Sequence, residues 1–398
     1  MENLNMKNII LNHVSIKEYQ IVYPRRGTLF EKQVALHVAS RLQDLIGESL
    51  PILSDEVPCS DKNEILIGKT NRTEAASLYG SVEDKMNGVI AGSGKFIALY
   101  GATAYGIAMA ATAFTNQVRS ATATDEATVD LTFSNEVIEK TDKIAAMTYN
   151  VYTGDVTHRR VYRLFEMIFR YMPNVIGVQE ANFVWMAALK YYLSEYYDMV
   201  GEGRGDKVNG GESCAILFAK DRFELIDSGT KWLSETPDLI SKLPDSAHLR
   251  IMTYALLKDR ISGLTTLYVN THLDYTPIQD EQTKIMIRLV QELGYEKYPL
   301  VLTGDMNARI ERPAMKRMMA AGLRSSNDLA DVNEGDPSID FIMVTDDCIR
   351  VSFARLCGEF IGDSMPSDHR PNYAEFTVFT PENGIQHDYS GGILFTES

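Results

Sequence analysis

Residues 300–307 read Leu300-Val301-Leu302-Thr303-Gly304-Asp305-Met306-Asn307, and this stretch decides the fold. Its first four residues are apolar or β-branched, a composition typical of a short buried strand. An aspartate and an asparagine follow directly, where the strand ends. Because α/β domains collect their binding sites at strand ends, the stretch predicts an α/β domain with a site at this edge.

The same arrangement recurs along the second part of the chain, where four more predicted strands carry polar residues of ligand type at one end. These are Asn150 after 144–149, Glu180 after 175–178, His272 after 265–270, and Asp368 with His369 before 373–379. Taken singly, an Asn or Asp there is usually a turn former, and a lone histidine is usually structural. The coincidence of five such boundaries indicates a functional site.

The remaining pattern is that of a mixed α/β domain, because short apolar runs alternate with segments of helical spacing. One such helical segment precedes Pro173, which ends it. The predicted strands are Ile144–Tyr149, Val175–Val178, Ala215–Phe218, Met252–Leu257, Thr265–Asn270, Leu300–Thr303, Ile339–Val344 and Tyr373–Phe379.

Residues 1–140 form a separate, smaller α/β domain by their pattern, and residues 141–398 form the second domain. The short polar run 139–142 marks the join. In the first domain, strands are predicted at Tyr19–Tyr23 and Glu64–Ile67. Helices are predicted at Glu31–Ile46, ended by Gly47, and at Ala102–Val118.

Composition narrows the class of protein. The 398 residues carry a net charge of −15, which argues against broad binding of long nucleic acids through a basic face. The four cysteines match no zinc or redox spacing. No apolar run approaches the ~18 residues of a membrane span, and the N-terminal stretch does not read as a signal peptide. The chain is therefore expected to be soluble and cytoplasmic.

The residue types at the strand ends indicate a particular chemistry. Carboxylate and amide oxygens suit Mg²⁺ or Mn²⁺, and Glu180 with Asn150 and Asp368 would suffice as metal ligands. His272 and His369 are candidates for proton transfer, and Asp340 could orient one of them. A metal, an acid–base pair and amide donors together indicate phosphoester hydrolysis.

Six ordered motifs in this region resemble the signatures of the endonuclease/exonuclease/phosphatase superfamily, the deoxyribonuclease I-like group. They are Thr148-Tyr149-Asn150-Val151, Gly177-Val178-Gln179-Glu180, Asn270-Thr271-His272-Leu273-Asp274, Gly304-Asp305-Met306-Asn307-Ala308, Ser338-Ile339-Asp340-Phe341-Ile342 and Ser367-Asp368-His369-Arg370-Pro371. The resemblance spans about 143–379. It implies a four-layer α/β/β/α sandwich with the site at one rim of two packed sheets.

The resemblance also implies roles for these residues. Glu180 corresponds to the principal Mg²⁺ ligand, with Asn150 and Asp368 close by. Asp305 and Asn307 correspond to the pair that positions the attacking water and the phosphate. His369 corresponds to the essential histidine, oriented by Asp340. His272 resembles the second histidine of the deoxyribonuclease and sphingomyelinase branches. The residues expected to contact substrate are Arg250, Asp274 and Asn307, although Arg250 could instead serve as an ion-pair partner within the protein.

Two departures from the family pattern concern substrate contacts. Ser338 stands where the fifth motif usually has a basic residue, and Asn372 follows Pro371 where an apolar residue is usual. Neither change removes a group with a predicted catalytic role.

The first domain resembles the accessory N-terminal α/β domain of family 20 and family 67 glycoside hydrolases. This resemblance rests on Tyr19–Tyr23, the helix ending at Gly47, residues 64–72 and the helix after Gly101. It implies a domain without catalytic residues, and it suggests a phosphorylated or lipid-linked glycan as substrate.

Three functions remain open at this point. The first is a Mg²⁺-dependent phosphodiesterase acting on nucleic acid or on a small or lipid-linked diester. The second is a phosphomonoesterase acting on a sugar or inositol phosphate. The third is a catalytically inactive protein that binds a glycan or another partner. The loop 202–212 is a candidate for closing over the substrate.

Overall fold

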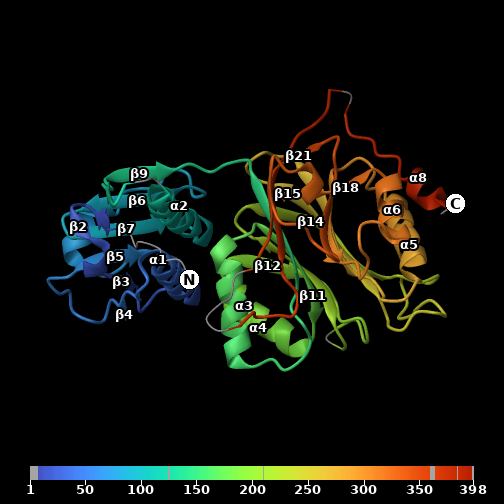
Figure 1. Cartoon of the computed structure of the whole chain (residues 1–398), viewed down its shortest axis with the longest axis horizontal. Helices are drawn as coiled ribbons and strands as arrows, with labels where there is room; N and C mark the ends of the chain where they lie inside the picture. Colours follow the sequence, from blue (N-terminus) through green and yellow to red (C-terminus); the bar gives the residue numbers. More distant parts are fainter. Residues whose placement is uncertain (1–7, 124–125, 209, 359–363, 383, 397–398) are drawn as a thin grey trace. The chain divides into compact units, whose positions relative to one another are not determined.

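The computed structural model describes residues 8–123, 126–208, 210–358, 364–382 and 384–396. Contacts between Cα atoms divide the chain into two compact units (Figure 1). The first comprises residues 1–140 with 169–172. The second comprises residues 141–168 with 173–398.

The first unit contains a six-stranded sheet of order β4-β3-β5-β7-β6-β9 and a three-stranded sheet of order β2-β1-β8. Its helices are α1 (Leu29–Ile46) and α2 (Ala104–Thr122). Its strands are β1 (Asn8–Leu11), β2 (Val14–Ser15), β3 (Tyr19–Tyr23), β4 (Ile52–Ser54), β5 (Asn63–Ile67), β6 (Gly88–Ser93), β7 (Phe96–Gly101), β8 (Thr128–Leu131) and β9 (Asn135–Ile138).

Helix α1 shows how local sequence sets an element. Thr28 and Glu31 form a reciprocal capping box at its start, which satisfies two backbone N–H groups that the helix leaves unpaired. Gly47 ends the helix with a φ of 75°, a left-handed conformation that glycine adopts without strain. The predicted helices and strands of the first unit are confirmed, with ends that differ by a few residues.

The second unit contains a seven-stranded sheet of order β12-β13-β11-β10-β22-β21-β19 and a six-stranded sheet of order β14-β15-β16-β17-β20-β18. Its helices are α3 (His158–Tyr171), whose last three residues belong to the first unit, α4 (Phe183–Leu193), α5 (Gln279–Glu292), α6 (Pro313–Ala320), α7 (Ser326–Leu329) and α8 (Ser390–Leu394). Its strands are β10 (Ile144–Asn150), β11 (Val175–Ala181), β12 (Tyr197–Val200), β13 (Ser213–Ala219), β14 (Phe223–Trp232), β15 (Ile251–Asp259), β16 (Thr265–His272), β17 (Leu300–Asp305), β18 (Leu323–Ser325), β19 (Val332–Glu334), β20 (Asp340–Thr345), β21 (Ile349–Leu356) and β22 (Asn372–Val378).

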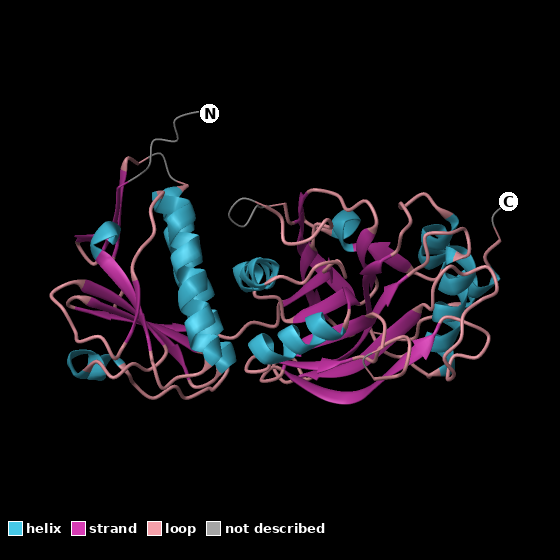
Figure 2. Cartoon of the chain, turned by 90° about the horizontal axis from the view of Figure 1, so that it is seen from below, coloured by secondary structure: helices cyan, strands magenta, loops and turns pink. Residues whose placement is uncertain are grey.

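These two sheets pack face to face, with β10 and β11 of one against β16 and β17 of the other. Helices α5, α6 and α8 lie on one side of the strands, and α3 and α4 lie on the opposite side (Figure 1). Figure 2 shows the magenta strands of this unit between cyan helices. The predicted four-layer α/β/β/α sandwich is therefore confirmed.

A polar network holds the two sheets together at their centre. Asn270 Nδ2 donates to the carbonyl oxygens of Val178 and Ala215 at 2.9 Å each, across the interface between the sheets. Gln179 Nε2 donates to Asn270 Oδ1 at 2.6 Å. Gly177 allows this close approach, because a Cβ there would lie 2.6 Å from Asn270 Oδ1. The network fixes the register in which the two sheets present their ends.

All eight strands predicted for the second unit are present, and most extend one to three residues beyond the predicted ends. Five further strands, β12, β14, β18, β19 and β21, were not predicted.

Three of the four cysteines are buried and Cys59 is half-buried, all as free thiols. Across the described ranges, no helix combines the length and apolar character that crossing a membrane requires.

Candidate active site

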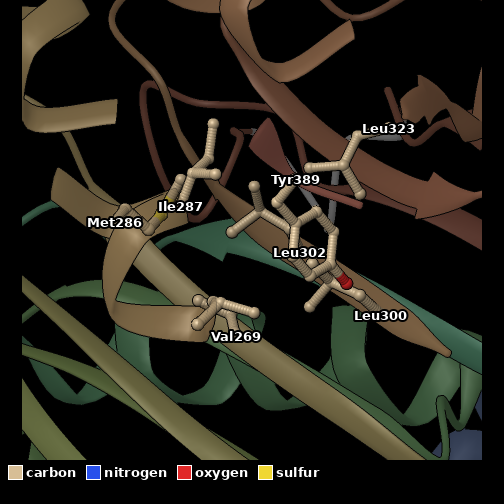
Figure 3. A pocket seen from close by; sticks show the side chains of 8 residues that line it. Val269, Met286, Ile287, Leu300, Leu302, Leu323 and Tyr389 are labelled. Atoms are coloured by element: carbon tan, nitrogen blue, oxygen red, sulfur yellow. The ribbon is translucent and has the colours of Figure 1, made fainter. Parts of the chain in front are cut away.

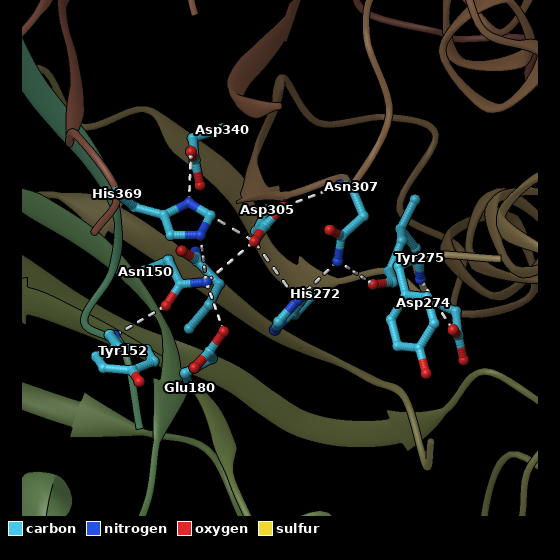
Figure 4. Close-up of polar contacts among 12 residues, drawn as sticks. Asn150, Tyr152, Glu180, His272, Asp274, Tyr275, Asp305, Asn307, Asp340 and His369 are labelled. Atoms are coloured by element: carbon cyan, nitrogen blue, oxygen red, sulfur yellow. Dashed lines mark hydrogen bonds and ion pairs between the residues drawn. The ribbon is translucent and has the colours of Figure 1, made fainter. Parts of the chain in front are cut away.

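The rim of the sandwich brings together side chains from both sheets (Figure 4). Asn150 ends β10, and its Nδ2 donates to Glu180 Oε1 at 2.9 Å and to Asp305 Oδ2 at 3.0 Å. Its Oδ1 accepts from the backbone N–H of Tyr152 at 2.9 Å, so the orientation of the amide is fixed. Asn150 thus joins a carboxylate of the seven-stranded sheet to one of the six-stranded sheet.

Three residues of this rim have left-handed backbone conformations that residues other than glycine rarely adopt. Glu180 has a φ of 57°, Tyr152 of 58° and Asn307 of 47°. The register of β11 against β13 shifts between Val178 and Ala181, which places Glu180 on a bulge. Strain of this kind is typical of functional sites.

His369 and Asp340 form a second pair at the rim. His369 Nδ1 hydrogen-bonds Asp340 Oδ2 at 2.8 Å, which leaves Nε2 facing Asn150 Nδ2 at 3.5 Å. Burial lowers the pKa of His369, but the hydrogen bond and negative charge of Asp340 outweigh it and raise this pKa to about 9. The imidazole is therefore held in one orientation beside Asp305, whose Oδ2 lies 3.8 Å from Nδ1.

His272 differs from His369 in its charge state. It is 6% exposed, and burial together with the nearby Arg250 and Arg204 holds its pKa well below the usual range. Asn307 Nδ2 donates to the carbonyl oxygen of Leu273 and lies 2.9 Å from His272 Nε2. The ring is neutral, so His272 can orient or hydrogen-bond a group but holds no proton to donate as an acid from the imidazolium form.

The carboxylates of the rim form a site whose chemistry fits a divalent cation. Burial and the neighbouring Asp340 raise the pKa of Asp305 to about 6, and burial raises that of Asp340. Ligand atoms of Glu180, His272 and Asp305 lie within 4.8 Å of one another. Closely spaced carboxylates with raised pKa values are what a hard cation such as Mg²⁺ stabilises.

The three predicted metal ligands are Glu180, Asn150 and Asp368, and their side chains have different partners in the structure. Glu180 faces the cluster with Oε1, while its Oε2 accepts from the N–H of Thr153 at 2.9 Å. Asn150 presents its nitrogen, not its oxygen, to Glu180 and Asp305. Asp368 is exposed and hydrogen-bonds Ser367 at 3.3 Å. Of the two predicted carboxylate ligands, Glu180 joins a group of metal-ligating side chains among the described residues, and Asp368 does not.

Two of the residues predicted to contact substrate, Asp274 and Arg250, lie in different surroundings. Asp274 is fully buried, and its carboxylate accepts from Ser246 Oγ at 2.7 Å and from the N–H groups of His248 and Tyr275. These bonds organise the segment that carries His248, rather than presenting the carboxylate to solvent. Arg250 is 4% exposed and lines a small pocket that Glu180 and His272 also line.

Both tryptophans donate hydrogen bonds to loops at this rim, a role that the sequence pattern does not indicate. The indole N–H of Trp185 donates to the carbonyl of Tyr152 at 3.0 Å, and that of Trp232 donates to the carbonyl of Arg204 at 2.9 Å. Arg160 packs over Tyr152 and Trp185 and donates to backbone carbonyls of the same loop. No sequence motif singles out Arg160.

The loop 202–212 is anchored along its described residues. Lys207 lies over the Trp232 ring at 5.2 Å, and Arg204 pairs with Glu212 at 3.0 Å. Asp206 accepts from the N–H groups of Val208 and Gly210. These contacts give the loop a defined hairpin-like form that delivers Arg204 to the pocket beside Glu180.

Two other features of the second unit lie away from the residues of the rim. An apolar cavity lies under α5, lined by residues such as Met286, Leu302 and Tyr389 (Figure 3). The group Asp347, Cys348 and His387 contains metal-ligating side chains. Burial raises the pKa of its thiol to about 12, which keeps the sulfur protonated.

Comparison with known proteins finds a family match in the later part of the chain. The sequence model of the Endonuclease/Exonuclease/phosphatase family matches residues 147–369. An endonuclease/exonuclease/phosphatase from Bacteroides vulgatus is 28% identical, with a TM-score of 0.55 over 60% of this chain and 100% of its own. Comparison with curated protein sequences gives no match.

Two other solved structures share the fold at lower identity. A mannosyl-6-phosphatase of Bacteroides thetaiotaomicron is 24% identical, with a TM-score of 0.54 over 59% of this chain and 99% of its own. The human Nocturnin catalytic domain is 20% identical, with a TM-score of 0.50 over 59% and 93%. The family match and the confirmed sandwich agree with the rim chemistry, and the chain belongs to the endonuclease/exonuclease/phosphatase family as a phosphoester hydrolase.

Proposed function

We propose that the second unit hydrolyses phosphodiesters with the help of Mg²⁺ or Mn²⁺. The observation that carries this proposal is the pair His369 and Asp340, set against the carboxylate cluster of Glu180 and Asp305. An alkoxide that leaves from a diester needs a proton, and a histidine oriented by an aspartate supplies one efficiently.

Each residue of the rim has its own role in the proposed reaction. Glu180 is the principal metal ligand, and the exposed Asp368 can approach the same cation from the loop before β22. A bound divalent cation would stabilise the negative charge that develops on the phosphoryl oxygens. Asn150 donates to Glu180 and to Asp305 and thereby bridges their carboxylates.

Asp305 is placed to accept a proton from the attacking water, because its carboxylate lies between both histidines. His369 carries its proton on the Nε2 edge that Asp340 leaves free. Asn307 donates its amide N–H groups at the opposite side, where it orients His272. The proton therefore passes from water to Asp305, and the leaving oxygen receives one from His369.

The charge of the chain favours small, lipid-linked or glycan-linked diesters over long nucleic acids, because a net charge of −15 opposes a polyanion. The same observation favours the second candidate, a phosphomonoesterase acting on a sugar or inositol phosphate. The first unit supplies none of the rim residues, and we propose that it has an accessory role.

The test is hydrolysis of bis-p-nitrophenyl phosphate and p-nitrophenyl phosphate in parallel, with Mg²⁺, Mn²⁺ or a chelator. We expect metal-dependent cleavage of the diester that His369→Ala abolishes and His13→Ala retains, since His13 lies exposed in the first unit. Cleavage of the monoester alone would favour the second candidate. Diester cleavage that persists in chelator would contradict the metal requirement.

A further inference from the structure

The side chain of Arg160 joins two loops of the rim, the Asn150 loop (residues 151–155) and the His369 loop (residues 364–369). Its Nε donates to the carbonyl of Pro366 in the His369 loop at 3.1 Å. Its other donors reach four carbonyls of the Asn150 loop at 2.7–3.0 Å, those of Val151, Tyr152, Gly154 and Asp155. An arginine has five N–H groups, so all of them are used here on backbone oxygens.

Each loop sets the position of a group with a proposed role in the reaction. In the Asn150 loop, the N–H of Thr153 donates to Glu180 Oε2 at 2.9 Å and orients that carboxylate. In the His369 loop, the N–H of His369 donates to Ser367 Oγ at 3.2 Å, and this hydroxyl donates to the carbonyl of Asn150 at 2.7 Å. A shift of either loop therefore moves Glu180 or His369 relative to the other.

Two aromatic rings hold the guanidinium group of Arg160 in place. Its central carbon lies 5.2 Å from the ring centroid of Tyr152 and 5.2 Å from that of Trp185. The carbonyl of Tyr152 accepts from both Trp185 Nε1 and Arg160 Nη2. Tyr152 has a strained φ of 58°, which these contacts keep in place. A lysine carries its charge on a single nitrogen with three donors and does not reproduce this planar set.

Arg160 acts on the rim through the backbone and does not touch the reacting groups. It lies in the first turn of α3, and Arg163 of the same helix ties the His369 loop again by donating to Ser364 Oγ. Within the part of the chain that the structure describes, Arg160 makes no ion pair. Its charge is directed at the carbonyls of the two loops instead.

We propose that Arg160 is a positioning residue, which holds the Asn150 loop and the His369 loop so that Glu180 and His369 act on one phosphoryl group. The inference rests on the proposed function and assigns the assembly of the two sides of the site to a helix outside it. Misplacement of reacting groups by about 1 Å costs about 100-fold in rate. Loss of Arg160 should therefore lower kcat, while KM changes little because the substrate contacts remain.

The first test measures Mn²⁺ binding by titration calorimetry, which needs no turnover. Arg160→Ala should weaken the binding that depends on Glu180 by about 10-fold or more, because groups that orient a metal ligand contribute about 10- to 100-fold. Glu180→Gln identifies this binding by its loss. Arg159→Ala, at the exposed neighbour in α3, is the matched control and should bind Mn²⁺ as wild type.

The second test measures hydrolysis of bis-p-nitrophenyl phosphate. The kcat of Arg160→Ala should fall about 100-fold, with KM within about threefold of wild type. Guanidinium chloride at a non-denaturing concentration should restore kcat about 10-fold, because the free ion offers the same planar donors, whereas sodium chloride at equal ionic strength should not. Arg160→Lys keeps the charge and should remain about 10-fold below wild type. This variant carries the test if circular dichroism shows that Arg160→Ala is unfolded.

The inference is overturned if Arg160→Ala binds Mn²⁺ and turns over substrate as wild type per folded molecule, as expected of an arginine that only stabilises the fold. Full kcat in Arg160→Lys would also overturn it, and so would a loss that guanidinium reverses no better than sodium. Absence of hydrolysis by wild type would refute the proposed function, and the Mn²⁺ titrations would then decide the inference. It fails there if wild type shows no Mn²⁺ binding that Glu180→Gln removes.

Discussion

Asn150 Nδ2 donates a hydrogen bond of 3.0 Å to Asp305 Oδ2, although the two residues end strands of different sheets. The same nitrogen donates to Glu180. One amide thus sets the spacing of two carboxylates that would otherwise repel each other, and it does so across the interface of the sandwich. The geometry of the site depends on this donor as much as on the acids themselves.

Asn150→Asp is therefore expected to damage the site more than its similar shape suggests. The substitution replaces the donor with a third negative charge, which should lower the free energy of unfolding by about 1–3 kcal/mol at pH 7 in chelator. Urea denaturation measures this. Asn150→Ala, which adds no charge, should lose less; a larger loss for the alanine variant would show that repulsion is unimportant.

Asp340→Asn tests the orientation of His369. The amide cannot stabilise the imidazolium form, so kcat should fall about 100-fold or more while KM changes little. Steady-state kinetics with bis-p-nitrophenyl phosphate measures both constants. Asp331→Asn, at an exposed ion pair with Arg350, is the matched control and should behave as wild type. An unchanged kcat in Asp340→Asn would remove His369 from the proposed proton transfer.

Gly177→Ala tests the contact between the sheets. A Cβ at this position would overlap Thr303 Oγ1 and crowd Asn270 Oδ1, so the sheets must separate. We expect a loss of about 1–3 kcal/mol in the free energy of unfolding, with a fall in kcat because the rim residues separate as well. Gly358→Ala meets only ordinary contacts at 3.5 Å or more, and it should leave both quantities unchanged.

Trp232→Phe tests the anchor of the loop 202–212. The phenyl ring keeps most of the apolar packing but loses the bond to the carbonyl of Arg204, worth about 0.5–1.5 kcal/mol. Hydrogen exchange of the loop amides should accelerate about 2- to 10-fold, because local opening becomes easier. Exchange of β16 amides serves as the internal control, and equal acceleration there would indicate global destabilisation instead.

His37 makes the stability of the first unit depend on pH. Burial, together with the positive charges of Arg41 and Arg170, lowers its pKa to about 3, while the unfolded value is about 6.5. Between these values the unfolded chain binds a proton that the folded unit does not. Stability is therefore full above about pH 6.5 and falls by about 1.4 kcal/mol per pH unit as the pH drops toward 3.

Hydrogen exchange of the α1 amides between about pH 7 and 5, corrected for the intrinsic pH dependence of exchange, measures this fall. His37→Phe should flatten the pH dependence, because it removes the titrating group. His13→Gln, at an exposed histidine, should leave the slope of wild type. A slope that His37→Phe does not change would assign the pH dependence to other groups.

The sandwich was predicted from the resemblance of the six motifs to the family, and the eight strands could be predicted from the sequence pattern because most of their residues are buried and form short apolar runs. Strand β13, Ser213–Ala219, is buried at every position. Strand β14 escaped prediction because eight of its ten residues are at least partly exposed, so no apolar run marks it. Edge strands are recognised by their pairing, which a single sequence does not contain.

The site residues that could be predicted differ from those that could not in where they lie along their strands. Glu180, His272 and Asp305 stand at strand ends, where polar side chains are conspicuous. Gln179 and Asn270 lie within strands, and only the packing of one sheet on the other gives them partners. The orientation of the Asn150 amide could not be predicted either, because the backbone of Tyr152 determines it.

The placement of the two tryptophans has a practical consequence. Trp185 and Trp232 are buried, and their indole groups bond to loops on either side of the rim. The chain has no other tryptophan. Its intrinsic fluorescence is therefore a built-in, label-free optical reporter for both loops of the second unit, and ligand titrations can be followed by emission without attaching a dye.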